Sequence, residues 1–74
     1  IIIMATAMQK DVLIELLSGT MIDIRNITSP TISKDKTQLK LMRSAVYSLP
    51  CLKINYNEYI ERIEKIRLRY GINN

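Results

Sequence analysis

Apolar residues recur along most of this chain at steps of three and four positions, the spacing that lines one face of an α-helix. The first such stretch predicts a helix over residues 2–18. Its apolar side chains are Ala5, Met8, Val12 and Leu16, with Leu13 and Leu17 widening the face. This helix is expected to end at Gly19, because glycine readily adopts the backbone conformation that terminates helices.

Residues 20–27 carry two competing patterns. The spacing of their apolar positions fits a short helix that Thr20 caps. The alternation of apolar and charged residues from Ile22 to Arg25 fits a β-strand instead. No partner strand is evident in the neighbouring sequence, so we predict a short helix here.

A helix start signal stands at Ser29 and Pro30. The serine side chain can accept a hydrogen bond from the free amides of the first turn, and proline lacks the N–H that has no partner there. The predicted helix covers residues 29–48. Its apolar face comprises Ile32, Leu39, Met42, Val46 and Leu49. Pro50 ends it, because a residue that precedes proline avoids the helical conformation.

The last helix is predicted over residues 55–70, after a short extended connector at residues 51–54 that packs onto the core. Asn55 and Glu58 approximate a capping box, and Gly71 is the expected stop. The apolar stripe comprises Tyr56, Tyr59, Ile63, Ile66 and Tyr70. This spacing favours core or interface packing for the tyrosines, with base stacking as the alternative.

These elements predict an all-α fold, a small bundle of three long helices plus a short fourth helical segment. The 74 residues form one domain, and the chain can be a fragment of a longer one because it does not begin with Met. Such a small domain buries only about 60 % of its unfolded surface. We therefore expect a homodimer or larger assembly, with residues 1–8 in its interface.

The net charge of +4 favours acidic partners, and nine of the eleven cations follow Ser29. Lys36, Lys40 and Arg43 stand at helical spacing with Tyr47 at the end of their row. Such a row suits a phosphate backbone, and its alternative is the solvated face of an amphipathic helix. The last helix also carries Arg62, Lys65 and Arg69, for which ion pairs with Glu58 and Glu61 compete with phosphate contact.

The residue types exclude several kinds of chemistry. The chain has no histidine and a single cysteine, Cys51, which excludes a Cys/His zinc site, a Cys–His nucleophile pair and a Ser–His–Asp triad. Two glycines provide no glycine-rich phosphate loop. We predict no enzyme, no metal and no cofactor. Cys51 is expected to be a small buried apolar group, with a reactive thiol as the alternative, in a cytoplasmic protein without a membrane span.

The segment from residue 19 to 34 resembles the helix-turn-helix DNA-binding motif, and the resemblance extends weakly to residue 43. Recognition helices of that motif often open with a pattern like Ser-x-Thr-Ile-Ser-Arg, and the chain here reads Ser29-Pro30-Thr31-Ile32-Ser33-Lys34. Asn26 falls where the motif usually has glycine, and Asn tolerates a left-handed conformation. The chain departs from the motif at Ile22, Arg25 and Lys36.

The resemblance implies a recognition helix that enters the major groove of DNA. Residues at its start would lie near base edges and phosphate: Ser29, Thr31, Ser33 and Lys34. Lys36, Lys40 and Arg43 would contact the backbone further along. Together with the charge, this predicts a small basic DNA-binding protein, a regulator of phage or plasmid type, with RNA as a second ligand to consider. The alternative is a helical interaction or assembly subunit, viral or bacterial, with no nucleic-acid role.

Overall fold

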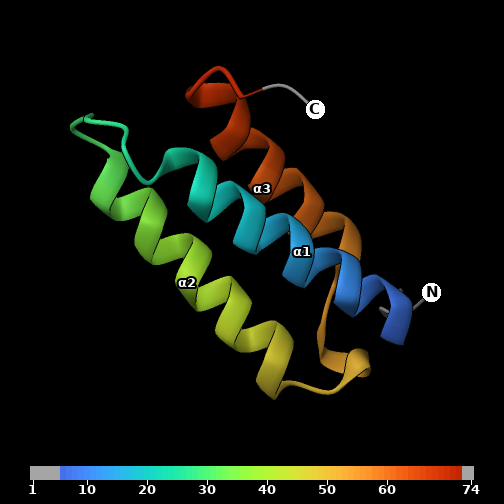
Figure 1. Cartoon of the computed structure of the whole chain (residues 1–74). Coiled ribbons are helices and arrows are strands. Elements are labelled where there is room, and N and C mark those ends of the chain that lie inside the picture. The colour runs from blue at the N-terminus through green and yellow to red at the C-terminus, as the bar shows by residue number, and fades with distance from the viewer. Residues whose placement is uncertain (1–5, 73–74) are drawn as a thin grey trace.

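A computed structural model of the protein describes residues 6–72. Three α-helices follow one another: α1 (Ala7–Ile24), α2 (Ile32–Ser48) and α3 (Tyr56–Arg69) (Figure 1). A 3₁₀ turn, η1 (Cys51–Lys53), lies between α2 and α3. No strand occurs in the described residues, so the predicted all-α bundle of three helices is confirmed.

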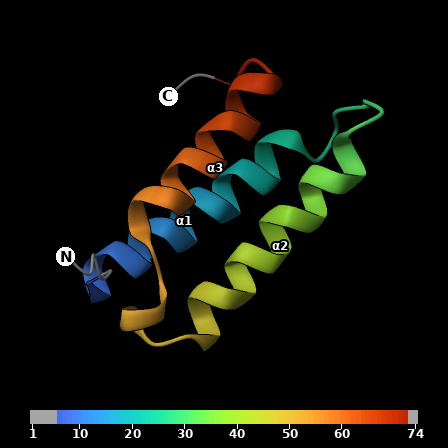
Figure 2. The same ribbon diagram turned by 180° about the vertical axis from the view of Figure 1, so that it is seen from behind.

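The core forms around α1, which packs against both other helices, while α2 and α3 contact each other little. Figures 1 and 2 show α1 lying between α2 and α3 from either side. The buried row of α1 consists of Leu13, Leu17, Thr20 and Ile24. It meets Leu39, Met42 and Val46 of α2, Ile63 and Ile66 of α3, and Ile54 of the preceding connection. The apolar residues predicted for the centres of α2 and α3 are therefore in the core.

The predicted break at Gly19 is wrong, and so is the separate short helix at residues 20–27. Helix α1 runs through Gly19 to Ile24 without interruption. Thr20 and Ile24 continue the buried row of the preceding turns, and their burial outweighs the roughly 1 kcal/mol by which glycine disfavours a helix interior. The predicted face is also rotated, because Met8 is 77 % exposed.

Helix α1 begins later than predicted. Thr6 has an extended backbone, and its hydroxyl accepts a hydrogen bond from the amide of Gln9 at 3.0 Å. The Gln9 side chain in turn accepts from the Thr6 amide, which completes a capping box. The predicted helix start at residue 2 and most of the predicted interface at residues 1–8 lie outside the described residues.

The predicted start signal of α2 acts as a tight turn that precedes the helix. The Ser29 hydroxyl accepts a 3.4 Å hydrogen bond from the Thr31 amide, and the Ser29 carbonyl accepts from the Ile32 amide at 3.2 Å. Regular α-helix begins at Ile32, three residues after the predicted start. Asn26 does not take the left-handed conformation that the resemblance suggested.

The remaining helix ends match the sequence more closely. Helix α2 ends at Ser48 as predicted, but Cys51–Lys53 forms a 3₁₀ turn where an extended connector was expected. The Asn55 side chain caps α3 by accepting from the Glu58 amide at 3.1 Å. Gly71 has φ +70°, and the Ile72 amide donates back to the Arg67 carbonyl at 2.8 Å. This is the Schellman arrangement that glycine permits after a helix.

Within residues 6–72, no helix combines the length and the apolar content that crossing a bilayer requires.

Candidate nucleic-acid interface

The structure distributes the six predicted contact residues over three sides of α2. Helix α2 faces the core through Leu39, Met42 and Val46. Residues one or two positions away from these three in the sequence point to the two flanks of the helix. Lys36, Lys40 and Arg43 lie on the flank next to α1. Thr31 and Lys34 line a groove next to α3, and Ser33 is exposed between the flanks. The predicted set is therefore not one patch.

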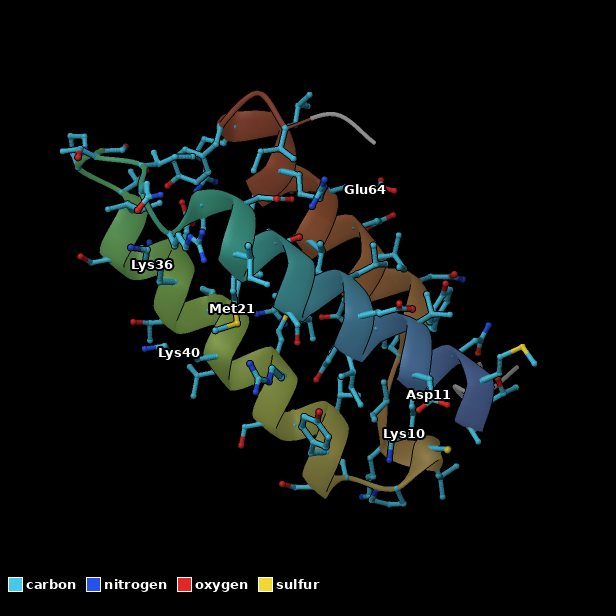
Figure 3. The ribbon with its side chains drawn as sticks, viewed as in Figure 1. Lys10, Asp11, Met21, Lys36, Lys40 and Glu64 are labelled. Atoms are coloured by element: carbon cyan, nitrogen blue, oxygen red, sulfur yellow. The ribbon has the colours of Figure 1, made fainter. Side chains whose placement is uncertain are left out.

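The flank next to α1 is a row of cations held by local contacts. Figure 3 shows Lys36 and Lys40 on α2, with Met21 of α1 nearby. Lys36 Nζ donates to the Arg25 carbonyl at 3.2 Å. Arg43 Nη1 lies 3.9 Å from the Met21 sulfur, and its guanidinium carbon lies 6.0 Å from the centre of the Tyr47 ring. A shallow hollow of about 300 Å³ lies here, lined by Met21, Lys40, Arg43, Ser44 and Tyr47.

The outer surface of α2 carries small hydroxyl side chains. Ser33, Thr37 and Ser44 are all exposed. The Thr37 hydroxyl donates to the Ser33 carbonyl at 2.9 Å, which leaves its oxygen able to accept a further hydrogen bond. Leu41, next to this strip, is exposed as well.

A second cationic surface lies between α2 and α3. A groove of about 480 Å³ is lined by Thr31, Lys34, Asp35, Gln38, Arg62, Lys65, Ile66 and Arg69. Three of its cations, Arg62, Lys65 and Arg69, are those for which the sequence offered phosphate contact as an alternative to ion pairs, and their spacing of three and four places them on one face of α3. The predicted pairs of Glu58 with Arg62 and Glu61 with Lys65 are absent from residues 6–72.

The groove is closed at its base by a buried carboxylate that the sequence analysis did not single out. Asp35 is only 4 % exposed and accepts hydrogen bonds from Arg69 Nη1 at 2.6 and 2.7 Å. The Tyr70 hydroxyl also donates to Asp35, and it lies 2.9 Å from the Thr31 hydroxyl. Asp35 continues the row of Ile32 and Leu39 at helical spacing, which is the signal that it would be buried.

The pKa of Asp35 results from opposing effects. Burial alone would raise it, because an apolar environment disfavours the charged carboxylate. The hydrogen bonds from Tyr70 and Arg69, with the charges of Arg69 and Lys34, outweigh burial and lower the pKa below its usual value. The same carboxylate raises the pKa of Arg69. The pair is therefore ionised at neutral pH.

Arg67, a further arginine of α3, contacts residues of α1. Arg67 Nη1 donates to the hydroxyl of Thr20, which is fully buried, at 2.9 Å. It also lies 3.2 Å from Asp23 Oδ2. These contacts join α3 to α1, so Arg67 is not counted among the cations of either surface.

The tyrosines and Cys51 differ in how closely their burial follows the sequence-based expectation. Tyr56, Tyr59 and Tyr70 pack partly buried against the core, which agrees with the packing interpretation. Tyr47 is 61 % exposed. Cys51 is half-buried and is a free thiol.

The helix pair that resembles a helix-turn-helix has its own geometry. In that motif a turn of three or four residues joins two helices at a large angle. Here residues 25–31 connect α1 to α2, and the two helices run side by side in opposite directions (Figures 1 and 2). These two features distinguish the α1–α2 hairpin from the motif.

Comparison with protein-family models, with curated proteins and with solved structures finds no match to the chain. In residues 6–72, no group of three or more Cys, Asp or Glu side chains is arranged to hold a metal ion.

Proposed function

We propose that the protein binds DNA and that α2 is the helix that contacts it. One observation carries this proposal: the exposed strip of Ser33, Thr37 and Ser44 has cations on both flanks. The major groove of B-DNA, about 12 Å wide, admits an α-helix. Small side chains allow the helix to approach the bases, while cations on its flanks reach the phosphates that border the groove.

The proposed contacts follow from position and chemistry. Lys36, Lys40 and Arg43 neutralise phosphates along the flank next to α1, and Lys34 does so on the other flank. Ser33 approaches the base edges. Thr31 lines the groove between α2 and α3, and its hydroxyl is already hydrogen-bonded to that of Tyr70. Its proposed role is therefore to hold the start of α2 in place. These are the six residues that the sequence predicted.

Duplex DNA is favoured over duplex RNA as the ligand. The major groove of A-form RNA is too deep and narrow for side chains to read, whereas that of DNA accepts a whole helix. Affinity for double-stranded RNA of the same sequence should therefore be lower than affinity for DNA, and should come from phosphate contacts alone.

A titration of a fluorescently labelled duplex, followed by anisotropy at several salt concentrations, tests the proposal. Binding should weaken steeply with salt, with a slope of about 0.9 per phosphate neutralised. Failure to bind more tightly than about 10⁻⁴ M even at low salt would overturn the proposal, because that is the weak limit of non-specific binding.

A second candidate function, a helical interaction or assembly module, has an observation of its own. Exposed apolar side chains occur at the end of the bundle where α1 begins and α2 ends: Met8, Tyr47, Leu49 and Leu52. An interface that covered these side chains would remove their apolar surface from water, which favours association. A homodimer formed there is compatible with DNA binding, since two copies of α2 can occupy half-sites one DNA turn apart.

Sedimentation equilibrium at tens of micromolar protein distinguishes a homodimer from a module that binds a different partner. A dimer mass that Leu52→Ser reduces to that of a monomer supports self-association through this end. A monomer mass in the unaltered protein contradicts the homodimer, and the interaction module then requires a different partner.

A further inference from the structure

The groove between α2 and α3 holds more positive charge than the protein itself compensates. Lys34, Arg62, Lys65 and Arg69 line it, and Asp35 is its one acidic lining residue. Three positive charges are therefore left to be balanced from outside. The acids of α3 are Glu58, Glu61 and Glu64, and none of them lines the groove. An anionic ligand with two or more charges fits this imbalance.

The two arginines of the groove are already oriented by the protein. Nη1 of Arg69 is bound to Asp35, and Nη2 of Arg62 donates to the side-chain oxygen of Gln38. The Arg62 guanidinium carbon also lies 5.8 Å from the centre of the Tyr59 ring. Each guanidinium carries five N–H donors, so each keeps donors for a ligand. Ordering these side chains in advance removes part of the entropy cost of binding.

The shape of the groove selects for an extended anion. Arg62 and Arg69 stand two helical turns apart on α3, about 10 Å along the helix axis. Lys34 lines the groove from α2 and Lys65 from α3. Its volume of about 480 Å³ lies in the range of small-molecule sites. A single small anion such as chloride would engage only part of this row.

We propose that the α2–α3 groove binds an extended phosphate-bearing anion, either a free oligophosphate or a stretch of nucleic-acid backbone. The oriented guanidiniums bind phosphate oxygens through paired N–H donors, and the two lysines supply charge from the two walls. The groove shares Thr31 and Lys34 with the α2 surface proposed to contact DNA, but its two arginines and Lys65 belong to α3, and the proposal does not depend on that function.

Thermal unfolding with added sodium pyrophosphate tests the site, compared with sodium chloride of equal ionic strength. At ten times its Kd, a ligand that binds only the folded protein should raise the Tm by about 5–10 °C. The variant Lys34→Ala/Lys65→Ala should lose this shift. The matched control Lys36→Ala/Lys40→Ala removes two lysines from the opposite flank and should keep it.

A Tm shift in the unaltered protein no larger than that given by chloride overturns the proposal. So does a shift that both double variants retain equally, because it would then not arise from this groove. Since both exchanged pairs are surface lysines, circular dichroism should confirm that each variant is folded before ligand is added.

The two sources of phosphate are separated by competition. If the groove takes nucleic-acid backbone, pyrophosphate displaces a labelled duplex more strongly than chloride does. The single variant Lys65→Ala, which leaves the proposed α2 surface intact, then also shows a smaller salt slope. If it takes a free oligophosphate, duplex binding responds to ionic strength alone. Stabilisation by pyrophosphate without any duplex binding would refute the DNA-binding proposal and leave the groove proposal supported.

Discussion

Asp35 of α2 accepts two hydrogen bonds from Nη1 of Arg69 in α3, although these two helices otherwise contact each other little. The carboxylate is buried, and the Tyr70 hydroxyl donates to it from the end of the same helix. This pair therefore fixes the position of α3 relative to α2 near the start of α2. It also forms the base of the cationic groove, so the stability of the fold and the geometry of the groove depend on one ion pair.

Asp35→Asn should reduce the free energy of unfolding at neutral pH by about 1–3 kcal/mol, because it removes charge-assisted hydrogen bonds from a buried site. Asp23→Asn is the matched control. Asp23 pairs with Arg67 but its side chain is 45 % exposed, so its loss should cost about 0–1 kcal/mol. Urea denaturation of the three proteins measures both values, and equal losses would contradict the assigned role of Asp35.

The same residue predicts a pH dependence with a definite sign. The pKa of Asp35 is lowered in the folded protein, so the carboxylate stabilises the fold wherever it is ionised. This contribution is fully present above the unfolded pKa of about 3.9 and is lost as the pH falls through the lower folded value. Unfolding free energies measured from pH 7 to 2 should therefore converge at the acid end for the unaltered protein and the Asp35→Asn variant. A constant difference between the two proteins over this range would exclude the contribution.

The sequence predicted those parts of the fold where one strong local signal acts alone. Asn55 and Gly71 mark the ends of α3 because a side-chain cap and a left-handed glycine act within a single turn. The Thr6–Gln9 capping box was equally readable, and it was missed because the apolar residues before it suggested a longer helix. At Gly19 a local stop signal competed with the burial of Thr20, a tertiary effect that sequence spacing alone did not resolve.

The candidate site was harder to predict because it is made of two helices. The row on α2 was visible from the spacing of Lys36, Lys40 and Arg43, all on one element. The groove requires knowing that α3 lies beside the opposite flank of α2, which only the packing of both helices on α1 determines. Asp35 looked like one scattered acid among several, although its place in the apolar row of α2 indicated burial.

Gly19→Ala should raise the free energy of unfolding by about 0.5–1 kcal/mol. The residue lies inside α1, and an added Cβ would meet no heavy atom within 4 Å, so the gain in helix propensity meets no steric cost. Gly71→Ala provides the contrast, because φ +70° disfavours a residue with a Cβ by about 1–2 kcal/mol. Thermal unfolding should move the two Tm values in opposite directions, and a destabilising Gly19→Ala would contradict the uninterrupted helix.

Ser33→Ala should change which DNA sequences are preferred more than it changes overall affinity. Ser33 lies on the exposed strip of α2, where the proposed complex places it near base edges, and a single hydroxyl supplies little phosphate contact. Selection of binding sites from a pool of random duplexes, performed for both proteins, measures the preference. An unchanged preference with weakened binding to every sequence would assign Ser33 to the backbone instead.

Lys40→Ala/Arg43→Ala should weaken duplex binding across all sequences and reduce the salt slope by roughly two units. Each of the two cations is proposed to neutralise one phosphate, and each neutralised phosphate contributes about 0.9 to the slope. Lys40→Ala alone should reduce the slope by about one. The matched control is Lys53→Ala, which removes an exposed lysine from η1, away from the proposed surface of α2. It lowers the net charge as much as Lys40→Ala does but should leave the slope unchanged. Equal effects of the two single substitutions would mean that DNA senses only the total charge of the protein, and α2 would then have no special role in binding.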